Sequence, residues 1–102
     1  MLASFSIVPI GIGEELKEPV ARVIKLIADS GLPYKLGAMQ TTVEGEPDQV
    51  IALIMNCHNL MRETCSRVLT HIAIDDRKGA TGRLEGKVAD VEEVLGEPLS
   101  RE

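Results

Sequence analysis

Aromatic residues are scarce in this sequence: the 102 residues include one Phe, one Tyr and no Trp. Proteins that bind single-stranded nucleic acid use aromatic side chains as platforms on which bases stack. Binding to phosphates also needs a basic surface, whereas this chain has a formal net charge of −5. We therefore expect no nucleic-acid partner, and the charge favours a neutral or cationic ligand.

Long apolar runs and metal-binding motifs are also missing. No run approaches the roughly 20 residues of a membrane span, and the first six residues lack the basic region of a signal peptide. Cys57 and Cys65 are eight positions apart, form no CxxC pattern and match no metal signature with His58 or His71. We expect a cytoplasmic protein without membrane contact, bound metal or cofactor, in which Cys57 is a buried free thiol.

Motifs typical of catalysis are absent. We find no Ser-His-Asp set and no phosphate-binding P-loop, and Gly11-Ile12-Gly13 lacks the third glycine of a dinucleotide fingerprint. The chain also offers no convincing acid/base pair. We therefore expect no catalytic residues, and the interpretation as a small α+β oxygenase or isomerase is disfavoured.

Apolar residues, in contrast, are plentiful enough (44%) to build a core in one domain spanning residues 1–102. Residues alternate in polarity where strands are expected and recur at helical spacing where helices are expected. In chain order we predict a strand at 2–9, a helix at 18–30 followed by Gly31, extended pieces at 34–36 and 39–44, a helix from about 47 to 63, a strand at 66–75 and a last helix capped by Thr81.

This β-α-β-β-α-β order predicts an α+β, ferredoxin-like sandwich with an antiparallel sheet and an extra C-terminal helix. Gly37-Ala38 joins the two extended pieces either as a hairpin or as one bent strand. Helices one and two cover one face of the sheet. We expect the alternating apolar residues of 68–74 to leave the other face bare, with the last helix shielding part of it. Stacking of these faces would then form a homodimer or homotetramer.

The chain resembles the thiamine-binding protein family, and the match covers nearly the whole sequence. The segments that carry it are Ser6-Ile7-Val8-Pro9-Ile10-Gly11, Gly31-Leu32-Pro33-Tyr34-Lys35-Leu36, Met39-Gln40-Thr41-Thr42-Val43-Glu44-Gly45, Arg67-Val68-Leu69-Thr70, Ile74-Asp75-Asp76-Arg77, Lys87-Val88 and Val91-Glu92. The resemblance implies homodimers or dimers of dimers that bind thiamine or its hydroxymethylpyrimidine moiety without a catalytic reaction. One departure is Gln40, where several relatives carry Gly, so ligand choice could differ here.

The strand at 39–44 is polar or mixed on both faces, which indicates an edge strand or the wall of a ligand pocket. Glu44 is the first candidate for ligand binding, because a carboxylate can pair with a thiazolium cation or an amino group. Thr41 or Thr42 could orient a pyrimidine edge through its hydroxyl, and periodicity does not say which. Met39 could supply a soft contact to a ring or fill the core.

Three further candidates lie on other strands. Ser4 and Ser6 share one face of the first strand, where they either form a polar pocket or meet water or a subunit interface. Asp75 ends the last strand, where it could approach the pocket of a neighbouring subunit. Phe5 is expected in the core.

Three functions remain open from the sequence. The first is a small-molecule binding protein for thiamine or its pyrimidine, acting as carrier, buffer or sensor. The second is an oligomeric regulatory or interaction module without a small ligand, and the third is the enzyme described above. If a ligand binds, we expect free thiamine or its pyrimidine rather than a phosphorylated form, because residues 39–45 have no basic cluster nearby.

Overall fold

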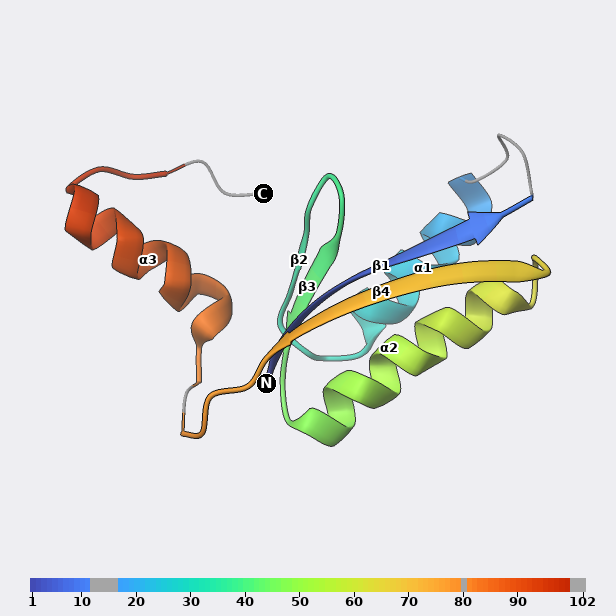
Figure 1. Cartoon of the computed structure of the whole chain (residues 1–102), viewed down its shortest axis with the longest axis horizontal. Coiled ribbons are helices and arrows are strands. Elements are labelled where there is room, and N and C mark those ends of the chain that lie inside the picture. Colours follow the sequence, from blue (N-terminus) through green and yellow to red (C-terminus); the bar gives the residue numbers. More distant parts are fainter. Residues whose placement is uncertain (12–16, 80, 100–102) are drawn as a thin grey trace.

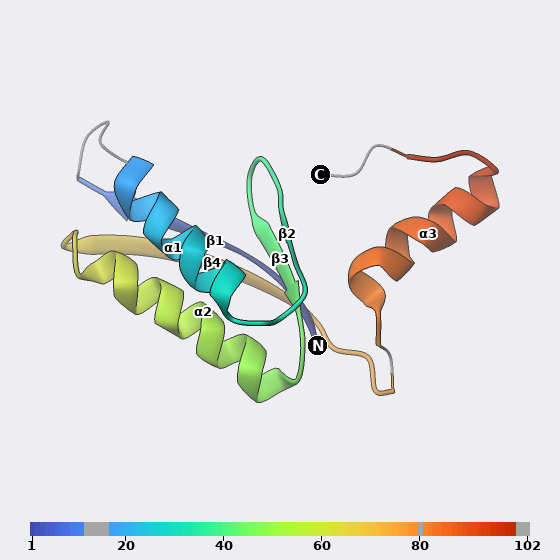
Figure 2. The same cartoon turned by 180° about the vertical axis from the view of Figure 1, so that it is seen from behind.

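The computed structural model describes residues 1–11, 17–79 and 81–99. Four antiparallel strands form one sheet in the order β2-β3-β1-β4. The elements are β1 (Leu2–Ile10), α1 (Lys17–Asp29), β2 (Tyr34–Leu36), β3 (Thr41–Glu44), α2 (Pro47–Arg62), β4 (Arg67–Asp75) and α3 (Arg83–Leu95). Helices α1 and α2 lie side by side on one face of the sheet, whereas α3 stands apart from them (Figure 1 and Figure 2). The predicted α+β, ferredoxin-like order is confirmed.

Local signals place the helix ends close to their predicted positions. Pro47 begins α2, and the Glu46 N–H donates to Gln49 Oε1 (3.3 Å). Gly31 follows α1 at φ 81°, a left-handed conformation in which glycine has no steric penalty. The predicted strand at 39–44 is shorter, because residues 37–40 form the turn of a hairpin and β3 begins at Thr41.

The hydrophobic core lies between the sheet and the layer of α1 and α2. Its most buried side chains have between 0% and 2% of their surface exposed: Ala3, Phe5, Ile27, Val43, Val50, Ile54, Cys57 and Met61. Alternate residues of a strand point to the same face, so the odd-numbered residues of β1 and β3 supply the sheet's half of this core. Phe5 is a core residue, as the sequence predicted.

The prediction that the alternating apolar residues of 68–74 lie on the face opposite the helices is wrong. Ile72 pairs with Phe5 and Ile74 pairs with Ala3 in the antiparallel ladder, so they point to the side of the helices. The opposite, open face carries mostly polar or small residues. Residues that lie directly opposite one another on neighbouring strands form four groups on this face: Lys35, Thr42, Ser4 and Ala73; Ser6 and His71; Glu44, Leu2 and Asp75; and Val8 and Leu69.

Ile72 and Ile74 are nevertheless 43% and 49% exposed, because β4 is an edge strand that α2 covers incompletely. Ile51 and Met55 are also partly exposed, one helical turn apart on α2. We call Ile51, Met55, Ile72 and Ile74 the β4-edge strip.

Glu44 attaches α3 to the open face. Its Oε2 accepts a hydrogen bond from the Arg83 backbone N–H (2.8 Å), and its Oε1 accepts one from the Leu84 N–H (3.3 Å). A carboxylate at this position satisfies N–H groups that have no partner inside the helix and also complements the helix dipole. The prediction that Thr81 caps α3 is therefore wrong: the residue before α3 is Gly82, at φ 66°, and the cap comes from another strand.

Lys35 forms an ion pair with Glu85, which adds a second contact between α3 and the open face at the β2–β3 corner of the sheet. α3 therefore contacts part of the open face, as the sequence suggested. Val91, Val94 and Leu95 of α3 remain 48%, 87% and 55% exposed.

Both cysteines are free and buried, as predicted for Cys57, and burial raises the pKa of the Cys57 thiol to about 11. Across residues 1–11, 17–79 and 81–99, no helix has the length and hydrophobicity needed to cross a membrane. Within the same ranges, no three His, Cys, Asp or Glu side chains are grouped closely enough to hold a metal ion.

We predict that Glu44→Ala lowers the free energy of unfolding by about 1 kcal/mol and accelerates proteolytic cleavage within α3, because two backbone N–H groups lose their acceptor. Urea denaturation and limited proteolysis measure these effects. Glu93→Ala is the matched control, since Glu93 is an exposed carboxylate on α3 itself, and it should change the free energy by less than about 0.5 kcal/mol. Equal effects of the two substitutions would show that Glu44 does not hold α3.

Candidate functional site

The ladder between β1 and β3 ends before β1 does. Its last pair is Phe5–Thr41, although β1 continues to Ile10. The chain turns back at Ala38–Met39, where the Gly37 N–H donates to the Gln40 carbonyl (2.8 Å) and closes the hairpin. Among the described residues, the second half of β1 therefore has a strand neighbour only on its β4 side. This early turn leaves a notch between β1, the hairpin tip and α1.

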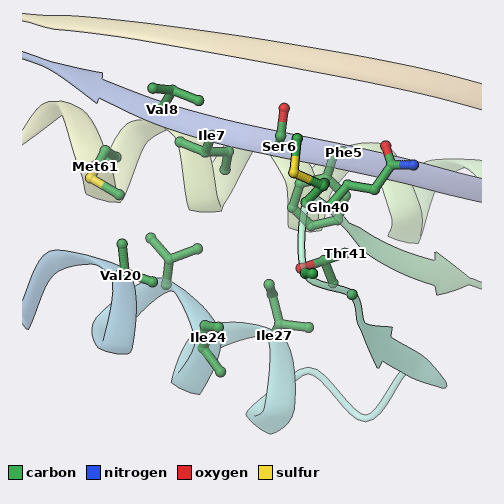
Figure 3. A pocket seen from close by; sticks show the side chains of 14 residues that line it. Phe5, Ser6, Ile7, Val8, Val20, Ile24, Ile27, Gln40, Thr41 and Met61 are labelled. Atoms are coloured by element: carbon green, nitrogen blue, oxygen red, sulfur yellow. The ribbon is translucent and has the colours of Figure 1, made fainter. Parts of the chain in front are cut away.

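The notch holds a cavity of about 220 Å³. Its walls come from the middle of β1, from the hairpin tip at residues 37–41 and from α1, with one residue of α2 (Figure 3). Apolar side chains dominate on the side of α1: Phe5, Ile7, Val20, Val23, Ile24, Ile27 and Met61. Val8 also lines the cavity, but its side chain lies on the same side of β1 as that of Ser6 (Figure 3). None of the described lining residues is ionisable.

Polar groups are few and lie on the sheet side of the cavity. Thr41 projects on the side of β1 that faces α1, whereas the Ser6 hydroxyl points to the far side (Figure 3). This difference follows from the ladder, because Thr41 pairs with the core residue Phe5 and Ser6 pairs with His71 of the open face. Ser6 lines the cavity, but its hydroxyl lies on the side of β1 away from α1.

The structure divides the seven predicted site residues between three places. Ser6, Thr41 and Met39 line the cavity, with Met39 at the hairpin tip and 87% exposed. Ser4 and Thr42 pair with each other on the open face. On the same face, Glu44 and Asp75 flank Leu2 from the two neighbouring strands. The cavity therefore brings together three of the seven, and their role in ligand binding stays a prediction.

Glu44 lines a second, larger cavity of about 820 Å³ between the start of β1, the start of α2 and the β4–α3 connection. Both carboxylate oxygens of Glu44 already accept hydrogen bonds from α3. The cavity also contains Asp76, Arg77 and Lys78, so its wall carries charges of both signs. Its wall also includes the apolar residues Met1, Leu32, Pro33 and Pro47, so this cavity differs from the notch cavity in its charged groups.

Sequence reasoning missed the contribution of α1. Val20, Ile24 and Ile27 recur at helical spacing, a pattern that predicts a core-facing stripe and cannot show that part of the stripe borders a cavity. Gly37 and Ala38 were recognised only as a junction between strands. The available signal is the difference in length between the two predicted strands, because residues 39–44 are too few to pair with all of residues 2–9.

The profile of the family described as thiamine-binding protein matches residues 3–92. The chain belongs to the thiamine-binding protein family. A protein of the UPF0045 group from Mycobacterium bovis is 36% identical over 96% of this chain and 97% of its own length. A UPF0045 protein from Bacillus subtilis is 33% identical over 92% of this chain and 96% of its own length.

Solved structures of other proteins share the fold of this thiamine-binding protein family member. A hypothetical protein from Methanocaldococcus jannaschii has a TM-score of 0.81 at 27% identity, over 90% of this chain and 95% of that chain. A Thermotoga maritima protein provisionally assigned to thiamine biosynthesis or salvage has a TM-score of 0.77 at 27% identity, over 88% of this chain and 96% of that chain.

We predict that dilute hydrogen peroxide oxidises Met39 first and Met61 last, because these side chains are 87% and 1% exposed. Peptide mass spectrometry after timed quenching measures the two rates, and Met55, 45% exposed, provides an internal intermediate. Equal oxidation rates for Met61 and Met39 would contradict the burial of Met61 in the core and the exposure of Met39 at the hairpin tip.

Proposed function

We propose that this protein is a non-catalytic binding protein that holds the hydroxymethylpyrimidine moiety of thiamine, free or within thiamine, in the cavity between β1, the hairpin tip and α1. The observation that carries the proposal is the lining of that cavity. Apolar walls and a few hydrogen-bonding groups on one side are the usual composition of a site for a small, flat, uncharged ring. Membership of the thiamine-binding protein family supports the choice of ring.

The size of the cavity favours one ring. Pockets for drug-sized ligands measure roughly 300–1,000 Å³, whereas this cavity measures about 220 Å³. The pyrimidine half of thiamine suits this volume, and its thiazolium half would then extend past the exposed Met39 into solvent. We therefore expect both free hydroxymethylpyrimidine and thiamine to bind.

The charge of the lining argues against phosphorylated ligands and against catalysis. Phosphate recognition uses Arg, Lys or a helix N-terminus, and the described lining residues include no cation. General acid–base chemistry needs a titratable group within hydrogen-bonding distance of the reacting atoms, and the same residues include none. The lining therefore fits binding rather than turnover.

We predict that Thr41→Val weakens binding of hydroxymethylpyrimidine by about 2- to 10-fold, the value of one neutral hydrogen bond. Valine keeps the branched shape, so the fold should be preserved. Isothermal titration calorimetry measures the affinity. Thr42→Val is the matched control: the neighbouring threonine pairs with Ser4 on the open face, and its substitution should leave the affinity unchanged.

The opposite pattern, a loss with Thr42→Val and none with Thr41→Val, would move the ligand to the open face beside Ser4. Absence of binding by the parent protein to thiamine and hydroxymethylpyrimidine alike would reject the proposed function and favour an interaction module without a small ligand.

We also propose that the protein forms a homo-oligomer through the edge of β4. This strand is nine residues long and has a strand neighbour only on its β1 side among the described residues. An open edge of this length with apolar residues beside it is a template for pairing with another chain. The β4-edge strip places Ile72 and Ile74 beside that edge, where antiparallel pairing of two copies would bury them.

We predict that the parent protein is a dimer or larger at micromolar concentration and that Ile74→Lys dissociates it, because each copy would place a charge at the paired edge. Sedimentation equilibrium measures the mass. Val94→Lys is the control, since Val94 is 87% exposed on α3, away from β4. Dissociation by Val94→Lys alone would assign the interface to α3, and a monomeric parent would reject self-association.

A further inference from the structure

Two hydrogen bonds determine which backbone groups of β1 face the notch. The Met1 nitrogen donates to the Gly45 carbonyl (2.8 Å), and the Gly45 N–H donates to the Met1 carbonyl (3.1 Å). In an antiparallel ladder, mutually bonded pairs alternate with pairs that exchange no hydrogen bonds. Odd-numbered residues of β1 therefore direct N–H and C=O towards β3, and even-numbered residues direct them towards β4.

Ile7 is the first odd-numbered residue beyond the last β3 pair, Phe5–Thr41. Continuing the register would place Ile7 opposite Met39, but the chain turns away there, and Met39 is 87% exposed. Among the described residues, no strand pair continues the ladder at this point. The register therefore directs the N–H and C=O of Ile7 towards the notch, whose cavity Ile7 also lines.

Pro9 supports this assignment. It occupies the next odd-numbered position of β1 and pairs with Val68 across β4. Proline has no N–H and is normally excluded from the interior of a strand that is paired on both sides. At position 9 a backbone N–H would point towards the notch and not towards β4. Proline at this position therefore costs the β1–β4 ladder no hydrogen bond.

We propose that the Ile7 backbone is the recognition element of the cavity and that it selects heteroaromatic rings with an amino group beside a ring nitrogen. The Ile7 carbonyl accepts from the amino group, and the Ile7 N–H donates to the adjacent ring nitrogen. The ring thereby forms the two hydrogen bonds that a residue of β3 would form with Ile7 if the β1–β3 ladder continued. This inference rests on the proposed function, because hydroxymethylpyrimidine has this donor–acceptor edge.

Such recognition makes the amino group decisive for affinity. A site built to hydrogen-bond a substrate group rejects the analogue that lacks it, because the buried protein group is left unpaired. The analogue of hydroxymethylpyrimidine with hydrogen in place of the amino group should therefore bind at least about ten-fold more weakly. The Thr41 hydroxyl does not replace this contact, since it lies on a different strand.

The direct test is amide hydrogen exchange of the ¹⁵N-labelled protein, followed residue by residue by NMR with and without saturating hydroxymethylpyrimidine. We expect the exchange rate of the Ile7 amide to fall at least about ten-fold on binding, because this N–H gains an acceptor. The Ser6 and Val8 amides are internal controls, since they already bond to β4 and should change little. The des-amino analogue, titrated by calorimetry, provides the ligand-side comparison.

Two failures are distinguishable. If hydroxymethylpyrimidine binds by calorimetry while the Ile7 amide keeps its exchange rate or the des-amino analogue binds equally well, the role of Ile7 is wrong and the proposed function stands. If neither thiamine nor hydroxymethylpyrimidine binds, the proposed function falls and the role of Ile7 falls with it.

Discussion

The early end of the β1–β3 ladder is the constraint on which the candidate site depends. Pairing stops at Phe5–Thr41 because the hairpin turns at Ala38–Met39, while β1 runs on to Ile10 along β4. A longer hairpin would fill the notch with its own backbone and satisfy β1 on both sides. The short one leaves an apolar cavity against α1 with strand hydrogen-bonding groups at its wall.

Most of the fold could be predicted from the sequence, because its signals are local. The alternation in residues 2–9, the helical spacing around Val23 and Ile27, and the turn residues at Gly31 and Pro47 each depend on near neighbours in the chain. Two of the wrong predictions, in contrast, involve residues that are distant from each other in the chain. Thr81 looked like the cap of α3 until Glu44, on another strand, supplied the acceptors. The apolar residues of 68–74 were expected on the open face, but the register places Ile72 opposite Phe5, on the side of the helices.

The candidate site was less predictable, because it depends on register and on what the ladder lacks. Polarity selected Ser4, Ser6, Thr42 and Glu44, yet the register turns these side chains to the open face, and Glu44 holds α3. Apolar residues of α1 that seemed purely structural form the cavity wall. The backbone of Ile7 carries no sequence signal at all, since every residue other than proline has the same N–H and C=O.

The measurement that tests this account most directly is a crystal structure of the protein with hydroxymethylpyrimidine bound. The account predicts the ring between β1 and α1, with its amino group and neighbouring ring nitrogen at hydrogen-bonding distance from the carbonyl and N–H of Ile7. A ring lying on the open face beside Ser4 and Thr42, or in the cavity beside Glu44 and Arg77, would contradict it.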